Sequence, residues 1–395
     1  MSGPSEPKLP RQVIILCAIG FVAALGFGIQ APSIPVFATE LGVNAAGVGI
    51  LVSGFAVARL ITGPPAGRLV NRFGETRILV PGTLLLAASS FGAAVAPNFE
   101  TLLIMRASGG IGSSMFTVGA MTLIYRLTPP DRVGTVIGYY QGAFQSGTVI
   151  GPVLGSLLTL WSIRAPFFAY GITAAICGLV AAIFVRSPGP LNRSPGSEGR
   201  RQPFKLRKVV RDKQFRVAMI TYFASGWASF GLRASVIPVF LLEVIQAAPS
   251  WIGVGLATGA IVQVILLPFA GRWADRWVFW RSLLIGDVIL LLAYVVLLSV
   301  PTVPGYLIAL AMLGAGVSFV TTGGARIVAR VSMRQGGGVT VGLSQSSVDA
   351  GMVAGPLIAG VLAEQFGFPV AFGVTMGVLV LAAVAAVSLR RDPAT

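Results

Sequence analysis

A pattern of glycine, proline and charged residues occurs twice in this chain at a constant separation. Gly67-Arg68 returns as Gly271-Arg272, and Gly151-Pro152 returns as Gly355-Pro356, each 204 residues further on. Agreement at separate positions is the mark of a repeated unit. It predicts that the chain consists of two copies of one unit of about 200 residues.

Composition determines the surroundings in which the two copies fold. Apolar residues make up 55% of the chain and charged residues only 11%. Apolar runs of about 20 residues, the length that crosses a bilayer as a helix, recur between short polar segments. Strands of an open sheet would leave unpaired backbone groups in lipid, so we expect an all-α membrane protein with twelve transmembrane helices. The expected spans are 12–37, 45–66, 78–96, 101–123, 135–158 and 165–185 in the first copy, and 216–240, 251–270, 282–300, 306–328, 337–360 and 370–389 in the second.

The net charge of +16 is distributed unevenly. With the N-terminus inside, every Lys and Arg lies on the inner side except Arg164, which is outside, and four arginines within spans. This distribution predicts a cell (plasma or inner) membrane protein with both termini in the cytoplasm. It also accounts for the basic residues without nucleic acid, so we expect no nucleic-acid partner.

The expected units are two six-helix bundles at 1–185 and 216–395. Between them, residues 186–215 are rich in Pro, Gly and basic residues, and we expect a cytoplasmic linker. The chain contains no His, and it has no Cys-x-x-Cys sequence, P-loop or nucleophile–base arrangement. We therefore expect no enzyme activity, no metal and no cofactor.

Three motifs accompany the predicted spans. The first is Gly67-x-Leu69-x-Asn71-Arg72-x-Gly74-x-x-Arg77, and the second is Arg106-x-x-x-Gly110-x-Gly112. The third follows the fifth span and consists of Gly138, Gly147, Gly151, Pro152 and Gly155. Together they resemble the signatures of the major facilitator superfamily, and the third resembles the one associated with its drug:proton antiporter branch. Through the repeat, the resemblance covers essentially the whole chain.

This resemblance implies two pseudo-symmetric bundles that alternate between inward-open and outward-open states. The implied function is secondary active efflux of a small amphipathic molecule or drug in exchange for protons. The protein would act as a monomer in a bacterial cell membrane, with the proton gradient as its driving force. The alternative is a carrier of another branch, which imports a metabolite or moves an organic anion or a lipid-like solute.

In the family, the first motif helps to hold the two halves in one conformation. The residues implied to form this latch are Gly67, Arg68, Asn71, Arg72, Gly74 and Arg77, with Gly271, Arg272, Asp275 and Arg276 in the second copy. The family has an acid where this chain has Asn71, whereas Asp275 keeps it. An amide accepts a hydrogen bond but cannot hold an ion pair, which puts a charged latch in the first half in doubt.

The glycines of the third motif share one face of the fifth span. Gly147, Gly151 and Gly155 are spaced by four residues, which lets a neighbouring helix approach closely. Pro152 removes a backbone hydrogen bond and bends the helix. The resemblance implies that such a helix accompanies antiport, although close packing alone would require the same residues.

The repeat also aligns polar residues within the spans. Arg59 aligns with Gln263, Gln145 with Asp349, and Gln30 with Arg233, so each pair has one charged member. Equivalent positions of the two halves face a shared cavity near the midplane, and we expect these residues to line it. Further candidates for the cavity wall are Gln141, Gln345, Arg326, Phe27, Tyr140, Trp227 and Phe230. For the aromatic residues, packing or contact with lipid is the alternative, and Arg326 could extend to the membrane surface instead.

Asp349 and Asp287 are the carboxylates within the predicted spans. A proton-coupled carrier needs a group that binds a proton on one side and releases it on the other. A low dielectric favours the protonated form of such a group, and a nearby arginine favours the charged form. We expect Asp349, near mid-bilayer, to be the coupling acid, with Asp287 as the second choice. The second motif implies that Arg106 assists proton movement. A static ion pair that holds helices together is the alternative for either acid.

Overall fold

The computed structural model describes residues 10–43, 45–189, 206–276 and 279–391, and the regular elements in these ranges are all helices. The first half contains α1 (Arg11–Gln30), α2 (Ser33–Glu40), α3 (Ala45–Phe73), α4 (Thr76–Ala94), α5 (Phe99–Leu127), α6 (Val133–Thr159) and α7 (Ala165–Phe184). The second half contains α8 (Leu206–Arg211), α9 (Lys213–Ser225), η1 (Gly226–Leu232), α10 (Val236–Glu243), α11 (Ser250–Arg276), α12 (Phe279–Ser299), α13 (Val303–Val331), η2 (Ser332–Gly336), α14 (Gly337–Phe366), α15 (Phe368–Ser388) and η3 (Leu389–Arg391). Residues 190–205 of the expected linker lie outside the described residues.

Local chemistry explains where several helices begin and break. The Asn98 side chain accepts a hydrogen bond from the Thr101 backbone N–H at 2.9 Å and caps α5. Thr302, 204 residues later, caps α13 through the Gly305 N–H at 3.3 Å, so the repeat extends to helix caps. Pro32 directly precedes α2, and the first expected span is divided there into α1 and α2.

Ten helices in the described residues are long and apolar enough to cross a membrane, and the bent pair Lys213–Leu232 and Val236–Glu243 makes eleven. The expected fifth span is α6, which has 27 residues but is less apolar because it contains Gln141 and Gln145. It packs against α1 and α11 within the fold. The expectation of an all-α membrane protein is confirmed, and α6 shows that a span inside the molecule tolerates more polar residues.

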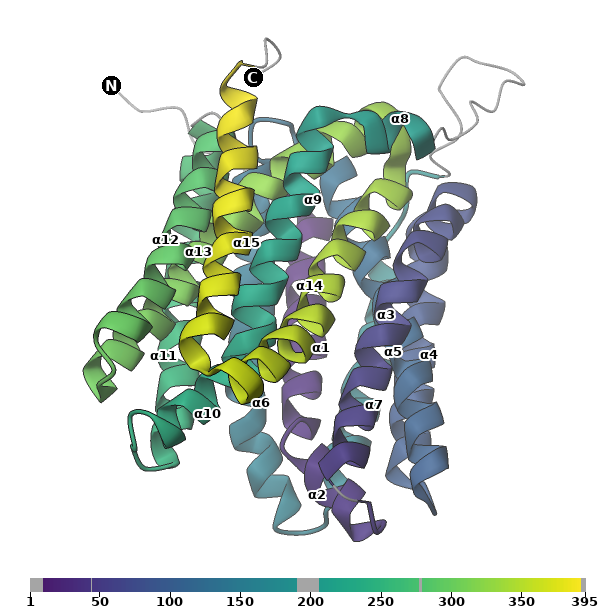
Figure 1. The fold of residues 1–395 in the computed structure, drawn as a ribbon. Coiled ribbons are helices and arrows are strands. Elements are labelled where there is room, and N and C mark those ends of the chain that lie inside the picture. Colours follow the sequence, from purple (N-terminus) through teal and green to yellow (C-terminus); the bar gives the residue numbers. More distant parts are fainter. Residues whose placement is uncertain (1–9, 44, 190–205, 277–278, 392–395) are drawn as a thin grey trace, which may run out of the picture.

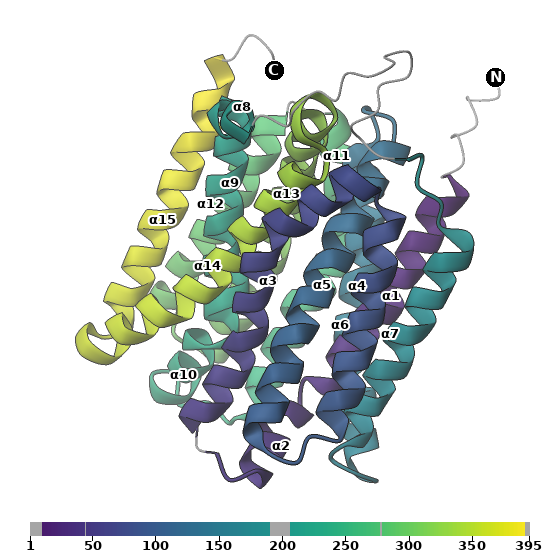
Figure 2. The same cartoon turned by 90° about the vertical axis from the view of Figure 1, so that its right-hand side faces the viewer.

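The helices form two bundles that meet through two main helix pairs. In the first pair α3 packs against α14, and in the second α6 packs against α11. We call the end where α1 begins, α15 ends and α8 lies the basic end (Figure 1), since Arg72 and Arg276 also lie there in the last turns of α3 and α11. At the basic end α3 and α14 are side by side, and they separate towards the opposite, or far, end (Figures 1 and 2).

Candidate functional site

An ion pair joins the two halves between α3 and α14. Arg59 Nη2 lies 3.3 Å from Asp349 Oδ1, and Arg59 Nε donates to Asp349 Oδ2 over 3.4 Å. Two such contacts are the fork geometry in which a guanidinium holds a carboxylate. The Asp349 side chain is only 4% exposed and that of Arg59 16%, so solvent ions screen the pair weakly. The structure therefore brings together two of the charged residues that the repeat alignment selected.

Two neutral side chains complete the surroundings of the pair. Gln345 lies one helical turn before Asp349 and donates Nε2 to Asp349 Oδ1 at 3.3 Å. Arg59 Nη1 donates to Ser113 Oγ of α5 at 3.1 Å. Arg59 is thus bound to its own half through Ser113 and to the other half through Asp349. If Asp349 moves away with α14, Arg59 keeps its hydrogen bond to Ser113.

The second interface between the halves differs in charge. The positions equivalent to Arg59 and Asp349 are Gln263 on α11 and Gln145 on α6. Gln263 is 4% exposed, and its Oε1 has no hydrogen-bond partner among the described residues. One interface therefore contains a carboxylate that can take up a proton, whereas the equivalent positions of the other carry amides that cannot.

Asp275, at the basic end of α11, binds the N-terminus of α6 in the other half. Its two carboxylate oxygens accept hydrogen bonds from the backbone N–H groups of Gly134 and Thr135, both at 2.7 Å. A carboxylate in this position satisfies N–H groups that have no partner within the helix and interacts favourably with the helix dipole. Arg326 of α13 lies 3.7 Å from Asp275 Oδ1, so this arginine is at the basic end.

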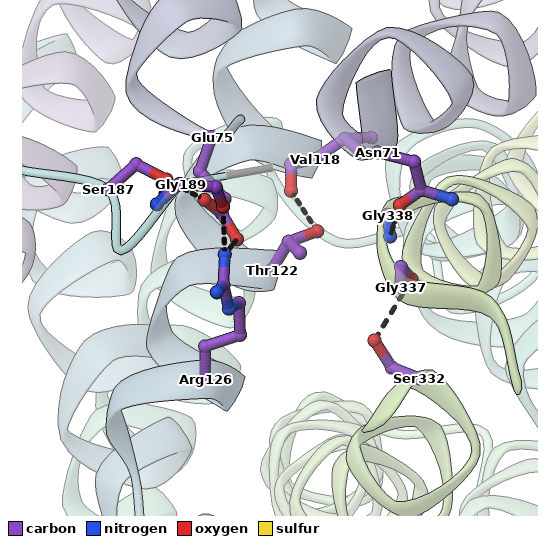
Figure 3. Close-up of polar contacts among 10 residues, drawn as sticks. All are labelled: Asn71, Glu75, Val118, Thr122, Arg126, Ser187, Gly189, Ser332, Gly337 and Gly338. Atoms are coloured by element: carbon purple, nitrogen blue, oxygen red, sulfur yellow. Dashed lines mark hydrogen bonds and ion pairs between the residues drawn. The ribbon is translucent and has the colours of Figure 1, made fainter. Parts of the chain in front are cut away.

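Asn71 makes the matching contact from the first half (Figure 3). It precedes Asp275 by 204 residues, and its Oδ1 accepts a hydrogen bond from the Gly338 N–H at 2.6 Å, at the start of α14. The amide oxygen keeps the acceptor function of the family's acid without its charge. Each half therefore binds the N-terminus of a helix in the other half through the same position of the repeat.

Glycine permits this close approach at the basic end. A Cβ at Gly67 would overlap the carbonyl oxygen of Gly338, and one at Gly271 would overlap that of Gly134. Backbone atoms cannot move aside as a flexible side chain can, so both positions require glycine. At Gly49, near the far end of α3, an added Cβ meets nothing within 4 Å. The halves are thus tightly packed at the basic end.

The glycines of the third motif act on two sides of α6. Gly138 faces Leu267 of α11, in the other half. The other members of the motif pack against α1 in the same half; they are Gly147, Gly151, Pro152 and Gly155.

A second charged cluster lies at the basic end of the first half, and the sequence analysis missed it. Glu75, between α3 and α4, is fully buried and accepts a hydrogen bond from Arg126 Nη1 at 2.7 Å. Ser187 donates to its other oxygen, and Arg126 also donates to the Gly189 carbonyl at 2.8 Å (Figure 3). The segment after α7 is therefore bound to Glu75 and Arg126. Glu75 lies four residues after Asn71 in the sequence. An acid within a loop of otherwise basic residues was the available signal.

The other basic latch candidates have separate contacts. Arg272 Nη2 donates to the Tyr139 hydroxyl of the other half at 2.9 Å. The Arg72 guanidinium lies 5.1 Å from the centre of the Phe73 ring. Among the described residues, no printed contact joins Arg68, Arg77 or Arg276 to the half opposite its own.

Two further arginines occupy equivalent spaces inside the two bundles. Arg106 is 6% exposed, and its guanidinium lies 4.7 Å from the centre of the Phe55 ring. The residue equivalent to Phe55 is Gly259, and Nη1 of Arg233 lies 3.5 Å from the place where its Cβ would be. Neither arginine forms a salt bridge within the described residues. Each of these two arginines is therefore a cation without a carboxylate partner in the described part of the chain.

Asp287 on α12 is in different surroundings from Asp349. It is fully buried, and neither of its carboxylate oxygens has a hydrogen-bond partner among the described residues. Its neighbour Thr221 on α9 donates its hydroxyl to the Val217 carbonyl at 3.1 Å. The structure places Asp287 inside the second half, away from the interface pair.

The aromatic candidates pack within their own halves. Phe27 contacts other rings of the first half, and Trp227 donates its ring N–H to the Thr375 hydroxyl of α15 at 3.1 Å. Tyr140 is 2% exposed, and Phe230 packs against the buried core. Gln30 is also buried, and its Nε2 has no partner in the described part of the chain. Tyr140 lies near enough to Arg59 for an electrostatic interaction, whereas no described contact joins Phe27, Trp227, Phe230 or Gln30 to the Arg59–Asp349 pair.

Comparison with known sequences gives one family and two named relatives. The family model described as Major Facilitator Superfamily matches residues 16–248 and 218–395. Multidrug resistance protein 1 of Bacillus subtilis is 30% identical over 258 residues, which is 64% of this chain and 65% of that protein. Quinolone resistance protein NorA of Staphylococcus aureus is 26% identical over 253 residues, 64% of each chain. The chain thus spans just under two thirds of the length of the curated relatives it matches.

Solved structures share the fold over almost the full length. The human organic anion transporter MFSD10 (TETRAN) has a TM-score of 0.78 at 18% identity, covering 95% of this chain and 100% of that one. The transporter FucP, solved in the outward conformation, has the same TM-score and identity and covers 95% and 97%. Members of this superfamily are membrane transporters and not enzymes. Because the family model matches both halves and the fold agrees, this chain belongs to the major facilitator superfamily.

Proposed function

We propose that this protein exports a small amphipathic molecule in exchange for protons, and that Asp349 carries the proton. The Arg59–Asp349 ion pair supports this most directly, because it joins the halves and one of its members is a carboxylate. Protonation removes the charge of Asp349 and weakens its attraction to Arg59. Proton uptake thereby favours separation of α3 from α14, a movement that alternating access requires.

Exchange requires that proton and substrate need different charge states of the same group. A substrate with a positive charge or with hydrogen-bond donors binds the charged carboxylate of Asp349. A proton removes that charge, so the two exclude each other. When Asp349 holds neither, it stays with Arg59 and keeps the halves together. The pair thus prevents the carrier from returning without a load, which couples the two movements.

The orientation follows from the basic residues at the closed end. We place the basic end in the cytoplasm, according to the positive-inside rule. The conformation described here is then closed towards the cytoplasm, and Asp349 receives protons from outside. An inwardly directed proton gradient drives efflux in this arrangement. The names of the relatives, a multidrug resistance protein and a quinolone resistance protein, support a drug-like substrate.

A carrier of organic anions is the second candidate, and Arg106 and Arg233 favour it. Neither has a carboxylate partner among the described residues, so a bound anion could balance their charge. An anion that binds Arg59 instead would release Asp349, which could then bind a proton in place of the arginine. Anion and proton would then cross the membrane together. The direction of coupling therefore separates the two candidates.

Purified protein in liposomes with an imposed pH gradient tests the proposal. A cationic dye is expected to accumulate against its gradient while protons move in the opposite direction. The variant Asp349→Asn should equilibrate the dye without accumulating it, whereas Asp287→Asn, in the same half, should still accumulate it. Accumulation by Asp349→Asn at the wild-type level would show that the coupling residue is wrongly assigned. An anionic dye that moves with protons would instead support the second candidate.

A further inference from the structure

A groove of about 360 Å³ runs along the outside of the first half, between α1 and α7. Ile19 and Cys177 form its floor, and both are buried. Its walls include Ile176 and Phe184, each 49% exposed. Every lining residue is apolar except Arg11, which lies where α1 begins at the basic end. The groove is therefore apolar along its length and cationic at one end.

The length of the groove matches one leaflet of a bilayer. Its lining on α1 extends from Arg11 to Val22, and eleven residues of helix span about 16 Å. Half of a typical hydrocarbon core of about 30 Å is about 15 Å. With Arg11 at the level of the lipid headgroups, the other end of the groove lies near the middle of the bilayer.

A second arginine is attached to the cationic end. The Arg186 backbone N–H donates to the Gln12 side-chain oxygen at 3.4 Å, which ties the segment after α7 to the start of α1. The side chains of Arg11 and Arg186 are both exposed, and no acidic residue of the described ranges lines the groove. Arg11 thus supplies a cation in the lining of the groove, and the backbone of a second arginine is bound beside it.

We propose that this groove binds one acyl chain of an anionic phospholipid, with the lipid phosphate at Arg11 and Arg186. Basic pockets between transmembrane helices are suited to anionic headgroups, and the apolar groove adds a place for the chain. Free phosphate would use only the arginines, and a neutral phospholipid only the groove. Helix α1 also packs against α6, the helix whose N-terminus Asp275 binds. A lipid that fills the space between α1 and α7 would therefore stabilise the first half.

Native mass spectrometry of the purified full chain tests this site. Phosphatidylglycerol and phosphatidylcholine with the same acyl chains are added separately, and the retained lipid is counted. The wild type is expected to retain more phosphatidylglycerol. The variant Arg11→Ala should lower this retention about fivefold, because one basic residue near the membrane surface is lost. Ala18→Trp, which fills the groove, should lower it as well. The matched control is Arg390→Ala, an exposed arginine at the same end on η3, which should behave as wild type.

Two results would overturn the proposal. One is equal retention of phosphatidylglycerol by the wild type, Arg11→Ala and Ala18→Trp. The other is equal retention of the two lipids by the wild type. Thermal unfolding in detergent without added lipid shows whether each variant is folded. Arg11→Lys keeps the charge and should retain phosphatidylglycerol, so its failure to do so in a folded protein would also count against the site. None of these outcomes depends on the transport proposal.

Discussion

Asp349 belongs to the ion pair that joins the halves, so a change at this side chain is expected to affect stability as well as the proposed transport. Removal of one partner from a buried ion pair leaves an uncompensated charge and costs about 3–5 kcal/mol, whereas replacement of both partners by neutral residues is often tolerated. Arg59 is partly exposed, so the penalty here is smaller. In the other interface, between α6 and α11, the positions equivalent to Arg59 and Asp349 are the neutral residues Gln263 and Gln145. Glutamine at both positions is therefore the substitution that the repeat itself suggests for testing the pair.

We expect Arg59→Gln to lower the free energy of unfolding by about 1–3 kcal/mol, because the Asp349 carboxylate loses its charged partner. The double variant Arg59→Gln/Asp349→Gln should recover most of this loss and yet be unable to couple transport to protons. Denaturant unfolding in detergent measures the first effect, and dye accumulation in liposomes measures the second. A double variant as unstable as Arg59→Gln alone would contradict this account of the pair.

The ion pair also predicts a pH dependence of conformation. If Asp349 carries the proton as proposed, binding of that proton removes the attraction to Arg59 that joins α3 to α14. Acidification should therefore increase the distance between spin labels placed on α3 and α14 at the basic end. In Asp349→Asn this distance should be long and independent of pH. A distance that varies with pH equally in both proteins would assign the effect to another group.

Between elements, the candidate latch consists of two helix N-termini, each bound by a residue of the opposite half. Asp275 binds α6 with a full charge, and Asn71 binds α14 with an amide oxygen. Both contacts satisfy N–H groups that a helix leaves unpaired, but a carboxylate also interacts with the helix dipole. The two sides of the latch therefore differ in strength, although their geometry is the same.

We expect Asn71→Asp to strengthen the closed basic end by about 0.3–1 kcal/mol, since it adds a negative charge at the start of α14. Its counterpart Asp275→Asn should weaken closure, because the charge at α6 is lost together with the ion pair to Arg326. The fraction of molecules that are open at the basic end, measured by spin-label distances, should fall in Asn71→Asp and rise in Asp275→Asn. A shift in the same direction for both variants would exclude this explanation.

At the scale of the whole molecule, closure at the basic end depends on backbone-to-backbone contact between the halves. Gly67 meets Gly338, and Gly271 meets Gly134, at equivalent positions of the repeat. Towards the far end, α3 and α14 separate (Figure 2). Rigid bundles that touch only at one end can exchange contacts by rocking, which is how members of this superfamily alternate between states.

Gly67→Ala should therefore favour opening of the basic end, because the added methyl group overlaps the Gly338 carbonyl. The rocking motion should then bring the far ends of α3 and α14 closer together. Spin labels at Val52 and Leu357, which are 51% and 64% exposed, measure this distance. The control Gly49→Ala, on the same helix with nothing within 4 Å, should leave the distance unchanged. Equal distances in Gly67→Ala and the wild type would argue against closure by glycine contact.

Much of the architecture follows from local properties of the chain. Apolar runs of membrane-spanning length predict the helices, and the separation of 204 residues predicts two equivalent halves. The same alignment selected Arg59 and Asp349 without showing that they touch. The sequence analysis also left Asn71 uncertain, because an amide has no charge to pair, whereas the structure shows that its oxygen accepts a hydrogen bond from the Gly338 N–H.

What the sequence alone determined is therefore the helices, the duplication and the family, because hydrophobic length and repeat spacing can be seen along the chain. Only the tertiary structure decided the partners. Arg59 and Asp349 are 290 residues apart, and Asn71 and Gly338 are 267 apart, so no helical period relates them. The Glu75 cluster likewise forms only when α5 and the segment after α7 meet. Such contacts depend on how two bundles pack, and packing is a property of the whole molecule.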